Sequence, residues 1–418
     1  MLDKGLERII REYYDIPAAP FSVQQKSEYI KEFLEEKGLK YEETDYYISS
    51  VINEGKADRK ILFLSHLDHP GFIFKNSTEG IALGTLYLDR IKEYAPISVY
   101  SPLGKYLGDV KIKSTSGLGN RNVQFKSNFD IPKNSQGLWS VADTHFTKER
   151  ILGRSNDNDI ATVLMLYNVE KVTDSKYQIQ YVFTKHEEVL QQSSFNLSKN
   201  DSLEIKKDDI VVNLESMKVY PITKIEEFSK LNYEDGPVLN ISEKSCIYNT
   251  EGRNIAESMI NNICEEKSIK IQRGFAGGTT DARSIVDFNL TNNVVTLNIP
   301  NRYKHNTDGK KIRAEEVYIN DVNAVSEIIR SILSSNDLDF SKNNNDLPLE
   351  KIKDLVKSRK RLYILNNRLD IASRDIIRRG YYYPQNILDI LKDFYWKSLS
   401  YLYYFINNGI GNIPVSKD

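Results

Sequence analysis

The sequence predicts an α/β protein with a mostly parallel β-sheet sandwiched by helices, a small inserted β-domain and an appended C-terminal helical hairpin. Apolar runs long enough for single strands alternate with amphipathic stretches through about the first 340 residues. The run KILFL is apolar at nearly every position, as in strands that are buried on both faces of a parallel sheet. One stretch is interrupted by glycine and proline and lacks helical periodicity, which predicts the inserted β-domain.

The elements before the insert are expected to be two helices and a strand. The charged N-terminus predicts a helix and not a signal peptide. A second helix is expected at 21–38, where Ser22 and Gln25 fit a capping box and Gly38 fits the position after the last turn. The apolar run KILFL at 60–64 predicts a buried strand.

Domain boundaries follow from changes in the character of the sequence. We expect the α/β domain to comprise residues 1–70 and 149–336, with the β-rich insert at 71–148. Within the insert, pieces such as PISVYS and GDVKIKST indicate strands between turns. After a polar linker, two helical stretches at 348–418 predict a hairpin whose second helix should be buried against another surface.

Strands and helices alternate again after the insert. Apolar runs predict three further strands, and amphipathic periodicity predicts three helices, the last of which begins at EEVY. The strands are expected at 177–184, 208–216 and 292–300, and the helices at 158–172, 254–267 and 315–333.

The composition narrows the classes of function. The chain has 57 basic and 58 acidic residues and a net charge of −1. This balance argues against nucleic acid or a membrane surface as a partner, because both attract a basic protein. No apolar run approaches the roughly 20 residues of a membrane span. The two cysteines, Cys246 and Cys264, are no disulfide framework, and we expect a cytoplasmic protein.

Side chains that could bind a divalent metal follow five of the apolar runs. A single such residue is more often a solvated loop residue, and an acidic pair is more often surface charge. Two adjacent carboxylates directly after a buried strand should nevertheless repel each other unless a cation is near. Five such places at the ends of predicted core strands therefore indicate a metal site. They are His66 with Asp68, Asp157, the pair Glu187 and Glu188, Glu215, and His305.

In this order, the five places resemble those of the two-metal aminopeptidases, most closely the glutamyl aminopeptidase and tetrahedral aminopeptidase family. The resemblance covers about residues 1–335 and implies the zinc aminopeptidase fold. Its stretch His-x-Asp-x-x-Gly-Phe is similar to HLDHPGF here, and its Phe-Val-Phe-Thr-x-x-Glu-Glu-Val is similar to YVFTKHEEV. The other similar stretches are GRSNDNDIA, GGTTDA and IPNRYKH.

The resemblance implies two divalent metal ions, with zinc as the first expectation and cobalt or manganese as alternatives. His66 and Glu215 would bind one ion, and Glu188 and His305 would bind the other. Asp157 would bridge the two ions. The insert lies where this family has its dimerisation domain, which implies a homo-oligomer.

The resemblance also assigns residues around the metals. Glu187 would be the general base for a metal-bridged water, and Asp68 would orient His66. Arg302 and Tyr303 either contact substrate or only pack beside His305. Asp281 either supports the site or caps the helix that begins at ARSIV, and Gly277 and Gly278 are expected to form a tight turn that lines the pocket.

The chain departs from the family pattern at three places. Asn158 and Asp159 replace the usual Asp-Arg, which reverses the local charge. Asn213 and Glu215 are both candidates for the metal ligand at the fourth of the five places, on the strand expected at 208–216. His69 stands where the family has Glu.

Three functions are compatible with these observations. The leading one is an aminopeptidase that acts on short peptides. The first alternative is a deacylase or amidohydrolase of N-acyl amino acids or of a specialised metabolite, with the same site. The second is an inactive pseudo-hydrolase that acts as a binding or assembly protein; the retention of Glu187 with all the ligand types argues against it.

Overall fold

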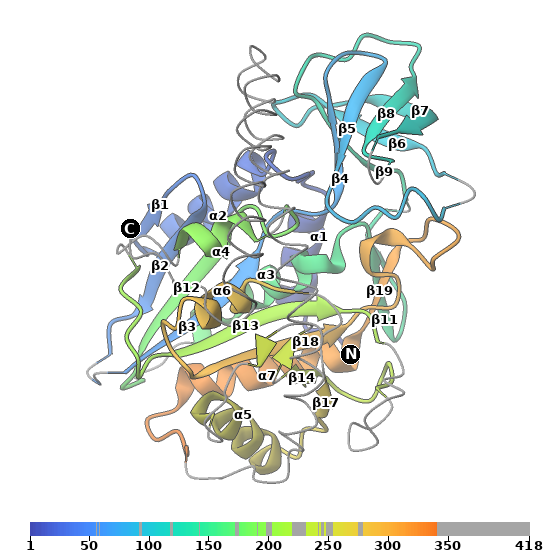
Figure 1. Ribbon diagram of the computed structural model, residues 1–418. Helices are drawn as coiled ribbons and strands as arrows, with labels where there is room; N and C mark the ends of the chain where they lie inside the picture. The colour runs from blue at the N-terminus through green and yellow to red at the C-terminus, as the bar shows by residue number, and fades with distance from the viewer. Residues whose placement is uncertain are drawn as a thin grey trace, which may run out of the picture. The chain divides into compact units, whose positions relative to one another are not determined.

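The computed structural model describes residues 1–340, and its main element is an eight-stranded mixed sheet (Figure 1). The predicted hairpin at 348–418 lies outside the described residues. No helix in the described part is both long and apolar enough to cross a membrane. Within 1–340, the residues that are not described are 56, 58, 92–93, 118–119, 142, 172–174, 190, 198–202, 220–230, 241, 244–245, 248–253 and 275–278.

The centre of the sheet is parallel, as the continuous apolar runs predict. Its order is β1-β2-β12-β3-β13-β18-β14-β17, in which the neighbours from β12 to β18 pair in parallel. The pairs β1-β2, β2-β12 and β18-β14 are antiparallel, and β14 pairs in parallel with the edge strand β17. The strands are β1 (Tyr41–Glu43), β2 (Tyr47–Asn53), β3 (Lys60–His66), β12 (Gln178–Thr184), β13 (Ile210–Met217), β14 (Val238–Asn240), β17 (Gln272–Gly274) and β18 (Val294–Pro300).

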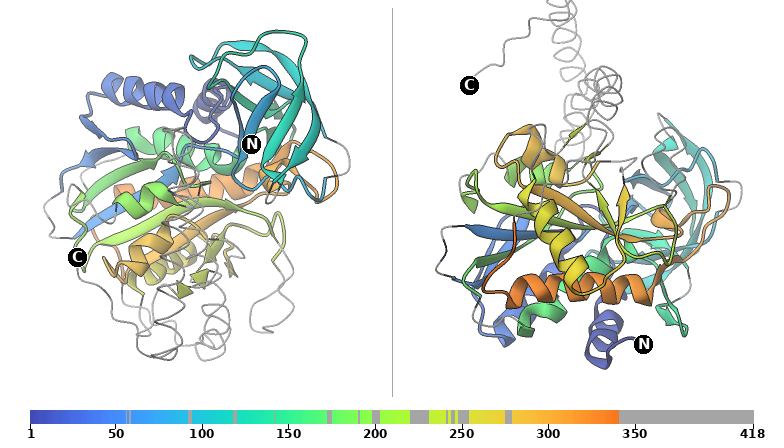
Figure 2. Two further views of the ribbon diagram at one scale, coloured as in Figure 1. Left: turned by 45° about the horizontal axis from the view of Figure 1, so that its top comes forward. Right: turned by 90° about the horizontal axis from the view of Figure 1, so that it is seen from below.

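Helices cover both faces of this sheet because its central strands bury apolar side chains on both sides. In β3, Ile61 and Phe63 belong to one apolar cluster, whereas Leu62 and Leu64 belong to another. Figure 2 shows α5 and α7 together beneath the sheet. The first cluster includes residues of α1 (Lys4–Tyr14), α2 (Gln24–Glu36), α3 (Asn156–Asn168), α5 (Ile255–Glu266) and α7 (Ile319–Ser334), and the second includes residues of α4 (Gln192–Leu197) and α6 (Ala282–Asp287).

The predicted β-rich insert is a closed barrel with a core of its own. Phe72, Phe74, Phe125 and Trp139 pack in its interior, and the chain enters the barrel five residues after the end of β3. The order around the barrel is β4-β5-β8-β7-β6-β9. Its strands are β4 (Gly71–Phe74), β5 (Glu79–Leu83), β6 (Ile97–Tyr100), β7 (Tyr106–Ser116), β8 (Asn122–Lys126) and β9 (Gln136–Trp139).

A third, smaller sheet corrects the prediction for the last helix. The segment EEVY is the strand β19 (Glu315–Tyr318), and α7 begins only at Ile319. This strand pairs antiparallel with β11 (Arg150–Gly153), which also pairs with β10 (His145–Phe146). The remaining short elements are β15 (Ser242–Glu243), β16 (Cys246–Ile247), η2 (Val169–Lys171) and η4 (Lys304–Asn306).

The start of α2 was predicted wrongly and its end correctly. The residue before the first turn is Val23, and no side chain caps the helix there, so the capping box of Ser22 and Gln25 is absent. At the other end, Gly38 has φ +69° and its N–H donates to the carbonyl of Glu35. Glycine adopts this left-handed conformation without a Cβ clash, which is why it follows the last turn.

Candidate metal centre

The predicted ligand residues come together at one edge of the central sheet. His66 is the last residue of β3, and Glu215 lies near the end of the parallel neighbour β13. Glu187 and Glu188 follow the end of β12, and His305 follows β18. Because the carboxyl ends of parallel strands lie at the same edge, residues far apart in the sequence become neighbours there.

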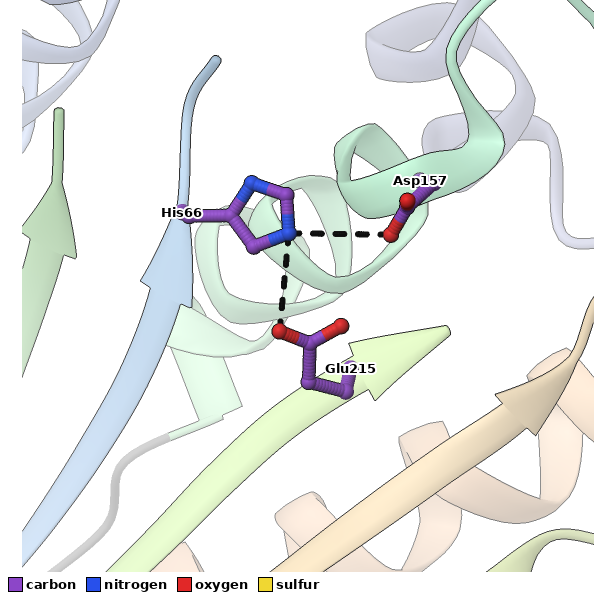
Figure 3. A group of neighbouring side chains, drawn as sticks. All are labelled: His66, Asp157 and Glu215. Carbon is purple, nitrogen blue, oxygen red and sulfur yellow. Dashed lines mark ion pairs between the residues drawn. The ribbon is translucent and has the colours of Figure 1, made fainter. Parts of the chain in front are cut away.

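The first group of ligand atoms, which we call the His66 set, consists of His66, Asp157 and Glu215. The Nε2 atom of His66 lies 3.6 Å from Oδ1 of Asp157 and 3.5 Å from Oε1 of Glu215. Figure 3 shows these three side chains pointing toward one another from β3, the start of α3 and β13. All three residues are buried, with exposures of 1% or less.

The second group, which we call the His305 set, consists of Asp157, Glu188 and His305. The Nε2 atom of His305 lies 3.1 Å from Oδ2 of Asp157 and 3.1 Å from Oε1 of Glu188. The two carboxylate oxygens of Asp157 therefore face different histidines. This places Asp157 between the two sets, as a bridging ligand would lie.

Hydrogen bonding supports a cation at this position. Three buried atoms, His66 Nε2, Asp157 Oδ2 and Glu188 Oε1, make no hydrogen bond of regular geometry among the described residues, although the two oxygens lie 3.1 Å from His305 Nε2. Buried polar atoms are usually paired, so three such atoms in one cluster indicate a missing partner. Imidazole nitrogen and carboxylate oxygen are ligands that zinc, cobalt and manganese accept. The residues therefore fit a divalent cation.

The pKa values around the cluster reflect its crowded negative charge. Burial raises the pKa of Glu187 well above its usual range, and the carboxylate of Glu188 adds to this. For His66 and His305, burial alone would lower the pKa, but the neighbouring carboxylates outweigh burial and raise it well above the usual range. These pKa shifts arise because several buried carboxylates lie close together, an arrangement that positive charge stabilises.

Asp68 connects His66 to the Glu187–Glu188 turn. The Nδ1 atom of His66 lies 2.9 Å from the backbone carbonyl oxygen of Asp68, whereas the nearest carboxylate oxygen of Asp68 is 3.7 Å away. The carboxylate of Asp68 instead accepts hydrogen bonds from the backbone N–H groups of Glu187 and Glu188, at 2.9 and 3.1 Å. The ring of His66 can thus donate from Nδ1 and present the lone pair of Nε2 to a metal.

Glu187 lies beside the ligand sets without belonging to either. It groups with His66 and Glu188, and its Oε1 accepts a hydrogen bond of 3.4 Å from Gln191. Glu188 instead faces His305. Adjacent residues that point to different partners are what a free base next to a ligand requires.

Glu315 holds the cluster together, although no sequence pattern selected it as a candidate. Its carboxylate accepts from the backbone N–H groups of Asp157 at 2.8 Å and His305 at 2.6 Å, and from the side chain of Asn301 at 2.9 Å. His305 has φ +61°, a conformation that is uncommon for residues other than glycine. Glu315 therefore fixes the backbone of both Asp157 and His305.

Glu315→Ala is expected to weaken metal binding roughly 10- to 100-fold, the usual effect of removing a group that orients ligands. The reason is that neither Asp157 nor His305 would keep its backbone position. Equilibrium dialysis against zinc measures this. Glu316→Ala is the control, because Glu316 pairs with Arg150 outside the cluster. Equal zinc affinity of the two variants would show that Glu315 does not support the metal ligands.

His69 also belongs to this supporting structure. It is 1% exposed, its Nδ1 lies 2.6 Å from the backbone oxygen of Asp157, and its Nε2 lies 3.0 Å from Oδ1 of Asn306. Burial lowers the pKa of His69 to about 4, which keeps the ring neutral. The histidine at this departure from the family pattern thus contacts the backbone of Asp157 and not the solvent.

The charge reversal at Asp159 is matched by a buried lysine. Lys26 of α2 forms an ion pair with the carboxylate of Asp159, and both side chains are 1% exposed. Ser155 also donates to Asp159. The neighbouring Asn158 donates to the backbone oxygen of Leu214 at 2.7 Å. These contacts anchor the start of α3 next to Asp157.

The structure distinguishes Glu215 from Asn213, the two candidates for a metal ligand on β13. Glu215 lies in the His66 set, whereas Asn213 donates to Thr280 at 3.1 Å.

Asp281 precedes α6, but its side chain makes no capping hydrogen bond, so the predicted cap is wrong. Its buried carboxylate instead accepts from Thr184 at the end of β12.

The other candidates lie outside the two sets. Arg302 is 41% exposed, and its guanidinium lies 3.7 Å from Glu316 and stacks over the ring of Tyr303. Gly277 and Gly278 lie outside the described residues.

Lys304 was not selected from the sequence, yet its ammonium enters the cluster. The Nζ atom lies 3.0 Å from Oδ1 of Asp157 and 3.4 Å from Oε2 of Glu215. Burial would raise the pKa of Asp157, but Lys304 and the two histidines hold it well below its usual range. The only sequence signal was its place directly before His305.

A comparison with known protein families matches the part of the chain that contains most of the cluster. The sequence model of the M42 glutamyl aminopeptidase family matches residues 135–326, which confirms the family resemblance. Asp157, both glutamates of the acidic pair, Glu215 and His305 lie within the match. A search of curated proteins finds no match to this sequence.

Solved structures with the same fold confirm the predicted fold class. The TET1 peptidase of Pyrococcus horikoshii superposes with a TM-score of 0.63 at 17% identity, over 79% of this chain and 99% of that one. An aminopeptidase of Desulfurococcus kamchatkensis gives 0.64 at 16% identity, over 79% and 94%. A TET aminopeptidase from a marine sediment thaumarchaeon gives 0.65 at 15% identity, over 80% and 97%.

Proposed function

We propose that this chain, whose residues 135–326 belong to the M42 glutamyl aminopeptidase family, hydrolyses amide bonds in a metal-dependent reaction and acts as an aminopeptidase on short peptides. The observation that carries this proposal is the position of Asp157 between two histidine-carboxylate sets, with Glu187 beside both. Such a site needs two ligand sets, one shared carboxylate and one carboxylate that is free to move a proton.

Two divalent cations, zinc in the first place with cobalt or manganese as alternatives, supply Lewis acidity and ease the deprotonation of water when they are bound. His66, Asp157 and Glu215 would hold one, and Asp157, Glu188 and His305 would hold the other. Asp68 and Glu315 orient these ligands through backbone hydrogen bonds.

Glu187 is the proton carrier in this proposal. Its carboxylate takes a proton from the attacking water and delivers it to the nitrogen of the leaving amine, so that the amide bond breaks without releasing a free amide anion. Burial raises the pKa of Glu187, which makes the carboxylate a better acceptor for that proton. Gln191 and the turn held by Asp68 keep it in place.

A deacylase of N-acyl amino acids with the same site is the second candidate. The family's Asp-Arg after the bridging residue is replaced here by Asn158 and Asp159, so the surroundings of the site differ from the family pattern. The inactive pseudo-hydrolase is disfavoured, because Glu187 and every proposed ligand lie together in the cluster.

Metal analysis followed by assays on amino-acid anilides, free peptides and N-acyl amino acids tests the proposal. We expect cleavage of substrates with a free amino group and at least one metal ion per chain after loading with zinc or cobalt. Cleavage restricted to N-blocked substrates would favour the deacylase. Less than one ion per chain would contradict the metal site itself.

We also propose that the chain forms a homo-oligomer through its inserted barrel. The Pyrococcus horikoshii TET1 peptidase, which has the same fold, assembles into a tetrahedron or a large octahedral shell. Light scattering after size-exclusion chromatography should give a mass several times the 48.2 kDa of one chain, whereas a monomer would contradict this proposal. Nucleic acid and membranes are not proposed as partners, and the cytoplasmic location stays a prediction.

A further inference from the structure

Lys304 brings a fixed positive charge into one of the two ligand sets. Its Nζ atom lies 2.8 Å from the backbone oxygen of Ser216, 3.0 Å from Oδ1 of Asp157 and 3.4 Å from Oε2 of Glu215. Three oxygen atoms from two elements therefore surround one ammonium group. Two of these oxygens come from carboxylates of the His66 set.

The two oxygens of Asp157 differ in consequence. Oδ1, which faces His66, already accepts hydrogen bonds from Lys304 and from Ser216 Oγ at 3.1 Å. Oδ2, which faces His305, and Oε1 of Glu188 each lie 3.1 Å from Nε2 of that histidine and make no regular hydrogen bond among the described residues. The His66 set thus contains a lysine ammonium in addition to its histidine, whereas the carboxylate oxygens that face His305 are contacted by the imidazole alone.

The exposure of the side chains also indicates that the His305 set is the easier one for an ion to enter. The side chains of His305 and Glu188 are 12% and 5% exposed, whereas those of His66 and Glu215 are 1% and 2% exposed. An ion that arrives from solvent therefore meets the more open set, whose carboxylate oxygens contact an imidazole that can itself serve as a ligand. An ion in the His66 set would lie beside an ammonium group of the same sign and would have to displace it from Asp157.

We propose that Lys304 makes the two ligand sets unequal: the His305 set binds the first metal ion, and the His66 set binds the second only when Lys304 withdraws from Asp157 and Glu215. Lysine is suited to such withdrawal because its stem is long and flexible, and the side chain of Lys304 is 22% exposed. Lys304 is a positioning residue here. The inference rests on the proposed metal site and adds an order of loading to it.

Calorimetric titration of the metal-free protein with zinc tests this proposal, with cobalt absorption spectra as a second readout. In the unchanged protein, we expect one tight ion per chain and a second that binds more weakly. Lys304→Met should strengthen the second site roughly 10- to 100-fold, the usual range for changes next to metal ligands. Lys304→Arg keeps the charge and should keep the inequality.

Two further variants assign the sites, and one controls for surface charge. Glu188→Ala should remove the tight ion, whereas Glu215→Ala should remove only the weak one. Lys310→Met is the control, because Lys310 is exposed on the same loop and should leave both affinities unchanged. Circular dichroism of each variant confirms folding.

The outcomes distinguish this inference from the proposed function. If two ions bind with equal affinity, or if Lys304→Met leaves the second affinity unchanged, the role of Lys304 is wrong while the metal site stands. If neither the unchanged protein nor Lys304→Met binds an ion, the metal site itself is contradicted.

Discussion

Glu187→Gln is expected to lower amide hydrolysis roughly 100- to 10,000-fold, the usual contribution of a general base, while metal binding stays close to that of the unchanged protein. Glutamine has nearly the same shape as glutamate but cannot accept the proton of the attacking water. Glu187 also belongs to neither ligand set, so its loss should leave the metal ligands in place. Turnover of an amino-acid anilide and metal content are measured on the same preparation.

Glu188→Gln is the matched control for this experiment. Glu188 is adjacent in sequence but faces His305, so its variant should lose metal as well as activity. If Glu187→Gln loses metal and Glu188→Gln keeps it, the base and the ligand have been exchanged in our assignment. Full activity of Glu187→Gln would exclude it as the base.

Asp159→Asn is expected to destabilise the protein by about 3–5 kcal/mol, because it leaves the charge of Lys26 buried without a partner. Lys26 and Asp159 are both 1% exposed, so water cannot replace the lost carboxylate. The double variant Lys26→Met, Asp159→Asn removes both charges and should recover most of the loss. Urea unfolding measures the free energy of unfolding of each variant.

A surface ion pair provides the control for this second prediction. Arg8 and Glu12 lie 3.2 Å apart on α1 with exposures of 66% and 43%. Exposed pairs of this kind contribute at most about 1 kcal/mol, so Arg8→Ala should change the free energy of unfolding little. An equally small change for Asp159→Asn, or a double variant no more stable than Asp159→Asn, would show that the buried pair does not anchor α3.

The fold was largely predictable because its central strands are buried on both faces. Such strands are rich in apolar residues, and β3, β12, β13 and β18 each contain a run that could be found without knowledge of their partners. EEVY was missed because it adjoins α7 directly, with no turn residue between the strand and the helix to mark the boundary. Its strand character arises from pairing with β11, a contact that spacing does not reveal.

The clustering of the candidate ligand residues was largely predictable, because most of them lie at or soon after the carboxyl end of a central strand. Asp157 is the exception, since it lies at the start of α3 after β11, outside the central sheet. The supporting residues were not predictable in this way. Glu315 accepts from the backbone of Asp157 across 158 positions of the chain, and Lys26 meets Asp159 across 133. Only the folded chain brings such pairs together, and nothing near these residues in the sequence marks them.

Hydrolysis of an unblocked amino-acid anilide before and after metal removal tests the central claim most directly. We expect a chelator to abolish turnover and added zinc or cobalt to restore it, and Asp157→Asn, which weakens the ligand common to both sets, to stay inactive after the same treatment. Turnover that survives complete metal removal, or an Asp157→Asn variant as active as the unchanged protein, would contradict the assignment of this cluster as the catalytic centre.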